Sequence, residues 1–334
     1  MALKIQMLIP HYHESEALVC RLLDSIAMQQ GIDLEKDVGV IICNDGTDVL
    51  LGSVTLESKY PFEVRYMVHE HSGVSATRNI LLDHATAEYV MCCDADDTFS
   101  HALGLYKIFE TIDNNDGFDM LTASFFEELY DSKTGKYQYI ERQKDPYFVH
   151  AKVFRRDFLT ENHIQWAESL KVSGDNYFLW QAIYLAKKKV ICKMPIYIWK
   201  HNPDSICRCK KNRFEKDYYL HIISDSMNIE DFLKRGMLDV AKHMIAGMIY
   251  DLYLKLEFQK WNEPKTLQML QKSLIMWSAC YQRYKPLYDS MAEEAKRYAM
   301  QERCEAHAVI INDRMIVDAE RLVQYMSERF RASA

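Results

Sequence analysis

Three aspartates follow an apolar segment in the first third of the sequence. Residues 89–93 read Tyr-Val-Met-Cys-Cys, and Asp94, Asp96 and Asp97 lie directly beyond them. An uninterrupted apolar run predicts a strand buried on both faces of a parallel sheet, and open α/β sheets bind ligands at the carboxyl ends of such strands. Two carboxylates separated by one residue can hold a divalent cation. Aspartates are also common in strand-end turns, so the cluster alone leaves both interpretations open.

Two earlier apolar runs also end in polar residues. The first covers residues 4–10 and the second covers residues 38–43. The polar residues that follow them are His11, Tyr12, His13 and Glu14 in the first case, and Asn44, Asp45, Thr47 and Asp48 in the second. Right-handed crossovers bring the carboxyl ends of parallel strands to one edge of the sheet. We therefore expect these two loops and the aspartate cluster to line one crevice.

Strands and helices alternate up to about residue 117. Apolar runs predict strands at 4–10, 38–43, 64–68 and 89–93, and helical spacing predicts helices after Ser15, from Gly73 to Ala85, and at 102–114. Ser15 is a suitable helix cap. Val74, Ile80 and Leu81 are expected on the inward side of the second helix. This alternation predicts βαβ units.

Beyond residue 118 the pattern is mixed, and beyond residue 212 it is helical. We expect strands at 120–129, 136–142, 149–154, 190–192 and 196–200, with helices at 155–163 and 177–187. The final helices are expected at 213–235, 237–258, 264–282, 286–303 and 313–331. The domain boundary is placed at residue 210, beside the basic residues Arg208, Lys210, Lys211 and Arg213. That basic run suits a solvated linker or a cationic loop that closes over phosphates.

The composition suits a folded protein without a strong positive field. The chain has 334 residues, a formal net charge of −7 and an isoelectric point near 6.0, so no specific nucleic-acid signal is present. Nine cysteines without regular spacing indicate reduced thiols. No stretch approaches the roughly 18 apolar residues of a membrane span, and the first residues do not form a signal peptide. We expect a cytoplasmic location.

Six motifs in register resemble the inverting family-two glycosyltransferases of the GT-A fold. They are Pro10-His11-Tyr12-His13-Glu14, Asn44-Asp45-Gly46-Thr47-Asp48, Gly73 with Thr77-Arg78-Asn79, Asp94-Ala95-Asp96-Asp97 (the DXD motif), Gly174-Asp175, and the aromatic strand from Tyr197 to Ser205-Ile206. His13, Asn44 and Thr77 depart from the family pattern. The resemblance covers roughly residues 3–207. It implies a GT-A-type, Rossmann-like mixed α/β sheet flanked by helices over residues 1–210, followed by an all-α domain over 211–334.

The resemblance also implies roles for individual residues. The catalytic base would be Asp175, for which a helix N-cap is the alternative. The metal ligands for Mn²⁺ or Mg²⁺ would be Asp96 and Asp94, with His201 either a further ligand or a surface histidine. Arg78 would approach the nucleotide or only pin its helix to Asp94. The nucleotide-sugar site would consist of Pro10, His11, Tyr12, Glu14, Asp45, Arg78, Asp94, Ala95 and Asp96.

The expected function is metal-dependent transfer of a single sugar from a UDP-sugar to an acceptor hydroxyl, with inversion. The acceptor is open: a glycan, a teichoic-acid-like polymer, a lipid-linked sugar or another hydroxyl compound in polysaccharide biosynthesis. Peripheral membrane contact and homo-oligomerisation through the helical domain also stay open. The alternative from another class is a non-catalytic nucleotide-sugar-binding or scaffolding protein. A nucleotidyltransferase is disfavoured because the first loop lacks glycine.

Overall fold

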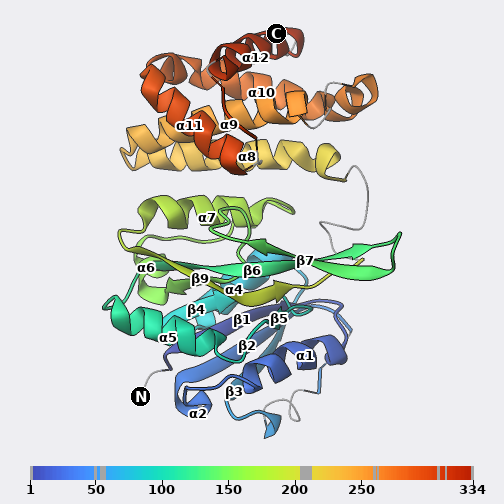
Figure 1. Cartoon of the computed structure of the whole chain (residues 1–334), viewed down its shortest axis with the longest axis vertical. Coiled ribbons are helices and arrows are strands. Elements are labelled where there is room, and N and C mark those ends of the chain that lie inside the picture. Colours follow the sequence, from blue (N-terminus) through green and yellow to red (C-terminus); the bar gives the residue numbers. More distant parts are fainter. Residues whose placement is uncertain are drawn as a thin grey trace. The chain divides into compact units, whose positions relative to one another are not determined.

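The computed structural model divides the chain into two compact units, Met1–Asp204 and Ser205–Ala334 (Figure 1). The residues that the structure describes are 3–48, 51–52, 58–203, 213–258, 261, 263–306, 309–312 and 314–331. Several expected features lie outside these residues, namely Ser205 and Ile206 of the last motif and the basic residues Arg208, Lys210 and Lys211. The side chain of Arg213 also lies outside them.

The first unit contains a mixed sheet whose amino-terminal half is parallel. Its strands are β1 (Ile5–His11), β2 (Val38–Asp45), β3 (Glu63–His69) and β4 (Tyr89–Cys92), in the order β3-β2-β1-β4. Every residue of β2 and β4 is buried. This is the environment expected of apolar runs covered on both faces.

The rest of the sheet mixes both strand directions. β8 (Lys152–Arg155) is antiparallel to β4 and to β6 (Met120–Asp131), whereas β9 (Lys189–Trp199) runs parallel to β6. β5 (Thr98–Phe99) and β7 (Lys136–Arg142) pair antiparallel with β9 and β6, respectively. The predicted mixed α/β sheet is thereby confirmed. The two short strands expected at 190–192 and 196–200 are the single strand β9. Its pairing with β6 shifts register near Ser124 of β6.

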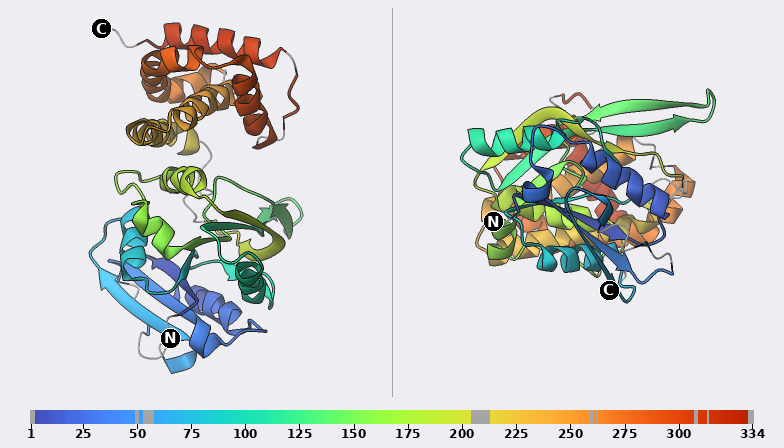
Figure 2. Two further views of the ribbon diagram at one scale, coloured as in Figure 1. Left: turned by 90° about the vertical axis from the view of Figure 1, so that its left-hand side faces the viewer. Right: turned by 90° about the horizontal axis from the view of Figure 1, so that it is seen from below.

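Helices cover both faces of this sheet (Figures 1 and 2). One core contains residues of α1 (Glu16–Ala27) and α5 (Gly104–Asn114), and the other contains residues of α4 (Val74–His84), α6 (Arg156–Glu161) and α7 (Gly174–Leu185). A one-turn helix, α2, covers Leu34–Asp37. Alternate residues of β1 enter opposite cores: Met7 faces the first and Leu8 the second.

Two further local expectations in this unit were wrong. Val74 is 38% exposed, because α4 turns Ser75, Arg78 and Leu82 toward the protein instead. The helix expected from residue 177 begins at Gly174, so Asp175 lies in its first turn and Ser173 is the N-cap. A carboxylate in the first turn is stabilised by the positive end of the helix dipole.

The second unit is helical within the part of the chain that the structure describes. Its helices are α8 (Arg213–Lys234), α9 (Leu238–Phe258), α10 (Pro264–Asp289), α11 (Glu293–Ala306) and α12 (Met315–Arg329). The break expected between 282 and 286 is wrong, since α10 continues through Pro286. Its buried Tyr281, Tyr284 and Tyr288 keep helical spacing across that point, so packing outweighs the proline. None of the described helices is long and apolar enough to cross a membrane.

Candidate active site

Strand order brings the predicted polar loops to one edge of the sheet. β1 lies between β2 and β4, and His11 is the register partner of Asn44. Leu8 of β1 is the partner of Cys92, and its carbonyl accepts a hydrogen bond from the amide of Cys93. The loops after β1, β2 and β4 therefore begin side by side, at the edge where open α/β sheets bind their ligands.

A buried arginine joins two carboxylates at this edge. The Arg78 guanidinium, in α4, donates through one nitrogen to Asp94 Oδ1 at 2.9 Å and through the other to Asp175 Oδ1. Arg78 is only 5% exposed, whereas the carboxylates of Asp94 and Asp175 are partly open to solvent. The contact with Asp94 is the one expected of an arginine that pins α4 to this residue. The structure adds a contact that pattern reasoning did not identify, the one to Asp175.

Asp175 is held from two sides through one oxygen. Oδ1 accepts from Arg78 and also from the indole Nε1 of Trp166 at 3.2 Å. Among the residues that the structure describes, none occupies Oδ2. The indole lies flat on Phe178 of α7, with ring centroids 3.7 Å apart and planes 6° from parallel. Asp175 therefore keeps one oxygen for a ligand while its orientation is fixed.

The residue after Arg78 holds the segment that carries the indole. Asn79 Nδ2 donates to the carbonyl of Trp166 at 3.0 Å, and the amide of Trp166 donates to Asn79 Oδ1 at 2.8 Å. α4 and α7 approach closely at Gly174, where a Cβ would lie 2.6 Å from Ser75 Oγ. The Arg-Asn pair of α4 thus positions Asp175 by two routes, one direct and one through Trp166.

Charge determines the ionisation of Asp94. Burial alone would raise the pKa of this carboxyl, but Arg78 outweighs burial and holds the pKa below its usual value. Asp94 is consequently an anion at neutral pH. Asp96 differs, because burial and then Asp94 raise its pKa, while the hydrogen bond that Asn202 Nδ2 donates to its Oδ2 at 2.7 Å opposes that change.

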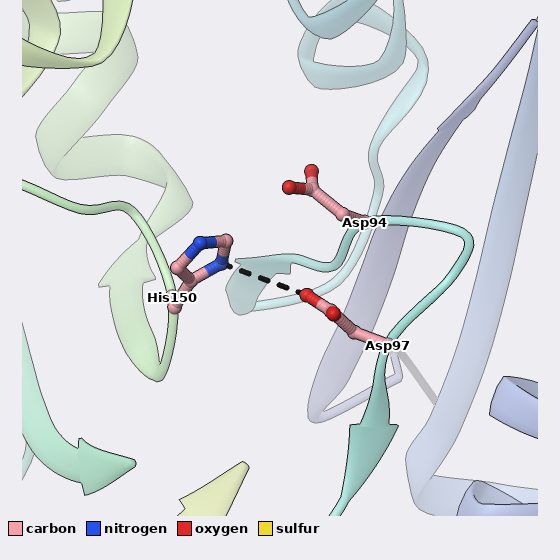
Figure 3. A group of neighbouring side chains, drawn as sticks. All are labelled: Asp94, Asp97 and His150. Carbon is pink, nitrogen blue, oxygen red and sulfur yellow. Dashed lines mark ion pairs between the residues drawn. The ribbon is translucent and has the colours of Figure 1, made fainter. Parts of the chain in front are cut away.

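Asp94 also belongs to a second group of potential metal ligands, together with Asp97 and His150. One oxygen each of Asp94 and Asp97 and one nitrogen of His150 lie within 4.8 Å of one another (Figure 3). His150 Nδ1 is 3.8 Å from Asp97 Oδ2, and among the described residues neither buried atom has a hydrogen-bond partner. Burial raises the pKa of Asp97 well above its ordinary value and lowers the pKa of His150. Carboxylate oxygens with an imidazole nitrogen form a donor set that fits Mn²⁺.

Of the three predicted metal ligands, Asp94 belongs to this group, whereas Asp96 and His201 do not. The His201 ring instead lies beside Tyr130 and Tyr137, with centroids 5.8 and 6.4 Å away. Its amide donates to Glu128 Oε1 at 3.1 Å.

The predicted nucleotide loop is already well ordered by its own contacts. The carboxylate of Asp45 accepts from the amides of Ser72 and Gly73 at 2.8 and 3.0 Å, and it lies 2.9 Å from His71 Nδ1. Asn44, which stands where the family has an acid, donates to Tyr66 Oη at 2.9 Å and accepts from the amide of Thr47 at 2.9 Å. An amide at position 44 therefore shapes the loop that presents Asp45.

The first loop presents an aromatic ring that stacks on His71, which in turn contacts this carboxylate. Tyr12 is 37% exposed and stacks on His71, with centroids 4.6 Å apart and planes 20° from parallel. Its amide donates to Glu14 Oε2, and the buried His11 contacts the carbonyl of Glu14 through Nε2. The other two predicted residues of the nucleotide-sugar site are less open: Pro10 is half-buried in β1, and Ala95 is 2% exposed in the core.

The structure adds residues that pattern reasoning did not place in the site. They are Trp166, His150, Asn202 and Tyr197, whose hydroxyl accepts from the amide of Asp94 at 3.0 Å. His150 and Trp166 lie in irregular segments, where hydrophobic periodicity carries no information. Asn202 and Tyr197 belong to the aromatic motif, but contacts across more than 90 positions leave no local signal of their place in the site.

Comparison with known proteins gives a family match over most of the first unit. Residues 7–165 match the profile described as "Glycosyl transferase family 2". The first unit belongs to this family. Residues that form the Asp94–Arg78 contact lie inside the matched segment, and Asp175 lies just beyond it.

Curated relatives and solved structures resemble the chain at low identity. Glycosyltransferase GlyA of Streptococcus pneumoniae is 24% identical over 244 residues, which are 67% of this chain and 34% of that protein. The minor teichoic acid biosynthesis protein GgaB of Bacillus subtilis is 22% identical over 269 residues, 75% of this chain and 29% of its own length. The chain thus spans about a third of these relatives.

The structural comparison extends over most of the chain. A crystal structure of Staphylococcus aureus TarS residues 1–349 superposes with a TM-score of 0.62 at 16% identity, covering 99% of this chain and 93% of that one. TarS 1–349 is also known in complex with UDP-GlcNAc. The mannosyltransferase PcManGT of Pyrobaculum calidifontis, in complex with GDP-Man and Mn²⁺, gives a TM-score of 0.53 at 15% identity, covering 92% and 86%. At these identities the likeness shows the fold.

Proposed function

We propose that the first unit transfers a single sugar from a UDP-sugar to an acceptor hydroxyl. The observation that carries the proposal is the pair of carboxylates bridged by Arg78, because it combines an anion at Asp94 with an oriented, partly open carboxylate at Asp175. Family membership supports the reaction class. The UDP-GlcNAc complex of TarS supports a uridine nucleotide as the donor.

Asp175 acts as the general base in this proposal. Its Oδ1 is occupied by Arg78 and Trp166, so Oδ2 is the oxygen that accepts the proton of the acceptor hydroxyl. The fixed orientation brings that oxygen to the acceptor without a conformational search. The deprotonated hydroxyl attacks the anomeric carbon directly, and a single displacement inverts its configuration.

Mn²⁺ or Mg²⁺ is proposed as the cofactor. Asp96 and Asp94 would hold it at the carboxyl end of β4. Asp97 and His150 lie close to Asp94 and are further potential ligands. A divalent cation in this position neutralises the charge that develops on the leaving diphosphate. The Mn²⁺ bound with GDP-Man in PcManGT supports this choice.

The nucleotide is proposed to bind over the loops that follow β1 and β2. Tyr12 offers an exposed ring for stacking, and the lone pairs of Asp45 that the loop amides leave available can accept from a base N–H. The acceptor remains a glycan, a teichoic-acid-like polymer, a lipid-linked sugar or a related hydroxyl compound. We also propose a cytoplasmic location, which is supported by the free thiols among the described cysteines.

The decisive experiment combines binding with turnover. The full chain is screened by thermal shift against UDP-Glc, UDP-GlcNAc and UDP-Gal, with Mn²⁺ and with EDTA, and hydrolysis of each donor is followed by UDP release. We expect a metal-dependent shift with at least one donor, together with slow hydrolysis. Absence of any shift in Mn²⁺ would overturn the proposal. A shift without turnover toward any acceptor would instead favour a non-catalytic nucleotide-sugar-binding protein.

A further inference from the structure

A hairpin formed by β6 and β7 presents three tyrosines that are about half exposed. Tyr130, Tyr137 and Tyr139, here called the hairpin tyrosines, are 44%, 54% and 52% exposed. Tyr130 is the register partner of Tyr137, and their rings lie 5.2 Å apart. Tyr137 and Tyr139 are two residues apart in one strand, so all three rings belong to the same face. Figures 1 and 2 show the hairpin projecting beyond the rest of the sheet.

The turn of the hairpin is ordered by its own hydrogen bonds. At its tip the Asp131 carboxylate accepts from the amide of Lys133 at 2.9 Å and from Thr134 Oγ1 at 2.8 Å. Gly135 has φ +68°, a conformation that favours glycine in such turns. The tyrosine face is therefore presented in one geometry. A preorganised face of this kind loses little conformational entropy when it binds a ligand.

Contacts connect this face to the candidate active site. The hydroxyl of Tyr139 donates to Glu128 Oε2 at 2.6 Å, and the amide of His201 donates to Glu128 Oε1. The next residue, Asn202, donates to Asp96 Oδ2 at 2.7 Å. One short segment after β9 thus contacts both the hairpin and the DXD motif, and the His201 ring in this segment lies beside Tyr130 and Tyr137.

We propose that the hairpin tyrosines bind saccharide rings of the acceptor. This inference rests on the proposed function, since it names the acceptor side of the same site. A sugar ring carries an apolar face of C–H bonds that stacks on an aromatic ring, while its hydroxyls stay in water. Exposed aromatic side chains gathered on one face mark an interaction surface. Neighbouring rings with matching exposure suit an oligosaccharide rather than a single sugar.

The tryptophans Trp166 and Trp180 do not share this exposure. Trp166 and Trp180 are 3% and 4% exposed, and Trp166 is committed to Phe178 and Asp175. The hairpin also carries the exposed Lys133 and Lys136 at its tip. These lysines could instead bind an anionic polymer. The experiment distinguishes such binding from the binding of saccharide rings by the tyrosines.

The experiment measures binding of the full chain to an array of defined oligosaccharides and to poly(glycerol phosphate). The variants are Tyr130→Ala/Tyr137→Ala, Tyr137→Phe, and Lys133→Gln/Lys136→Gln. The matched control is Tyr298→Ala, which removes a 64% exposed tyrosine from the helical unit. The thermal shift with UDP and Mn²⁺ is recorded for each variant, so that loss of folding is seen separately from loss of acceptor binding.

We expect wild type to retain oligosaccharides and the double alanine variant to bind them about tenfold more weakly. Tyr137→Phe and Tyr298→Ala should bind as wild type, because the first keeps the ring and the second lies elsewhere. Wild type that retains no saccharide, or a double alanine variant that binds normally, would overturn the inference. Retention of poly(glycerol phosphate) that depends on the lysines and not on the tyrosines would also overturn it. If wild type shows a thermal shift with UDP and Mn²⁺, any of these outcomes contradicts the inference alone and leaves the proposed function standing. If wild type lacks that thermal shift, the proposed function itself fails.

Discussion

Arg78 contacts Asp175 across 97 positions of sequence, and this contact ties the candidate base to the start of the DXD motif. One planar guanidinium serves both carboxylates, with Asp94 on one nitrogen and Asp175 on the other. The two terminal N–H groups of the guanidinium form a rigid fork, which suits two acceptors held at a fixed spacing. In the proposed reaction, one side chain would therefore position both the group at the leaving diphosphate and the base that deprotonates the acceptor.

Asp175→Asn tests the base. The amide keeps the size of the side chain and can still accept from Arg78 and Trp166, but it does not take up a proton. We expect UDP-sugar affinity to stay within about twofold and transfer to fall by a factor on the order of a hundred or more. Isothermal titration with donor and a radiolabel transfer assay measure the two effects. Asp157→Asn, at an exposed carboxylate paired with Arg156, is the control. Normal transfer by Asp175→Asn would remove Asp175 from the mechanism.

Arg78→Lys tests the bridge. A lysine retains the charge but not the planar fork, so it reaches one carboxylate and leaves the other without its donor. We expect the free energy of unfolding to fall by about 1–3 kcal/mol, together with a loss of transfer. Urea denaturation measures the first change. Arg65→Lys, on a half-exposed side chain in β3, should leave both stability and transfer close to wild type. An equally stable and active Arg78→Lys would show that the bridge is dispensable.

Asp96→Ala and His150→Gln locate the cation. If Asp96 is a direct ligand, its loss abolishes the part of UDP affinity that depends on Mn²⁺, while affinity in EDTA is unchanged. His150→Gln should then keep most of the metal dependence. Titration of UDP with and without Mn²⁺ decides the point, with Asp113→Ala, an exposed carboxylate paired with Lys4, as control. The reverse result would assign the ion to the buried cluster of Asp94, Asp97 and His150.

Asp225→Asn tests a buried carboxyl in the helical unit. Burial, and then the charge of Asp251, raise the pKa of Asp225 to about 7, although Arg303 and Lys255 oppose the change. His221 Nε2 also faces it, 3.7 Å from Oδ2. A carboxyl whose pKa is raised by folding stabilises the native state fully only below its unfolded pKa. That contribution is lost between about pH 4 and pH 7, because the unfolded chain ionises first.

The stability difference between Asp225→Asn and wild type should therefore grow in favour of the variant as the pH rises from 4 to 7. Its slope is at most about 1.4 kcal/mol per pH unit, and it should level off above pH 7. Urea denaturation at several pH values measures this difference, in which the other titrating groups cancel. Glu294→Gln, at an exposed residue of α11, should show no such slope. A difference that does not vary with pH would mean that Asp225 is ionised throughout.

Much of the fold can be predicted because its signals are local. The apolar runs of β1, β2 and β4 mark strands buried on both faces, and β7 begins and ends where the alternation of residues 136–142 predicts. The edge position of their loops follows from crossover handedness. Gly174 marks the start of α7 less clearly, since glycine is a poor helix former and is present here because Ser75 lies so close.

The parts of the site that sequence does not predict depend on distant contacts. Nothing local to Trp166 indicates that its indole will reach Asp175, and nothing local to His150 indicates that it will lie against Asp97. Asn44 illustrates the opposite case. Its departure from the family pattern is visible in the sequence, but only its hydrogen bonds to Tyr66 and Thr47 show that the amide shapes the loop.

The bond between the Trp166 indole and Asp175 also gives the site an optical signal. The indole is an emitter whose yield and wavelength respond to a neighbouring charge, and here it is buried and stacked flat on Phe178. Any ligand that protonates or displaces the Asp175 carboxylate changes the field on that ring. The difference in emission between wild type and Trp166→Phe isolates this residue from the other tryptophans. Under the proposed role of Asp175, occupancy of the acceptor side can thus be followed in real time, without a label and before any acceptor has been identified.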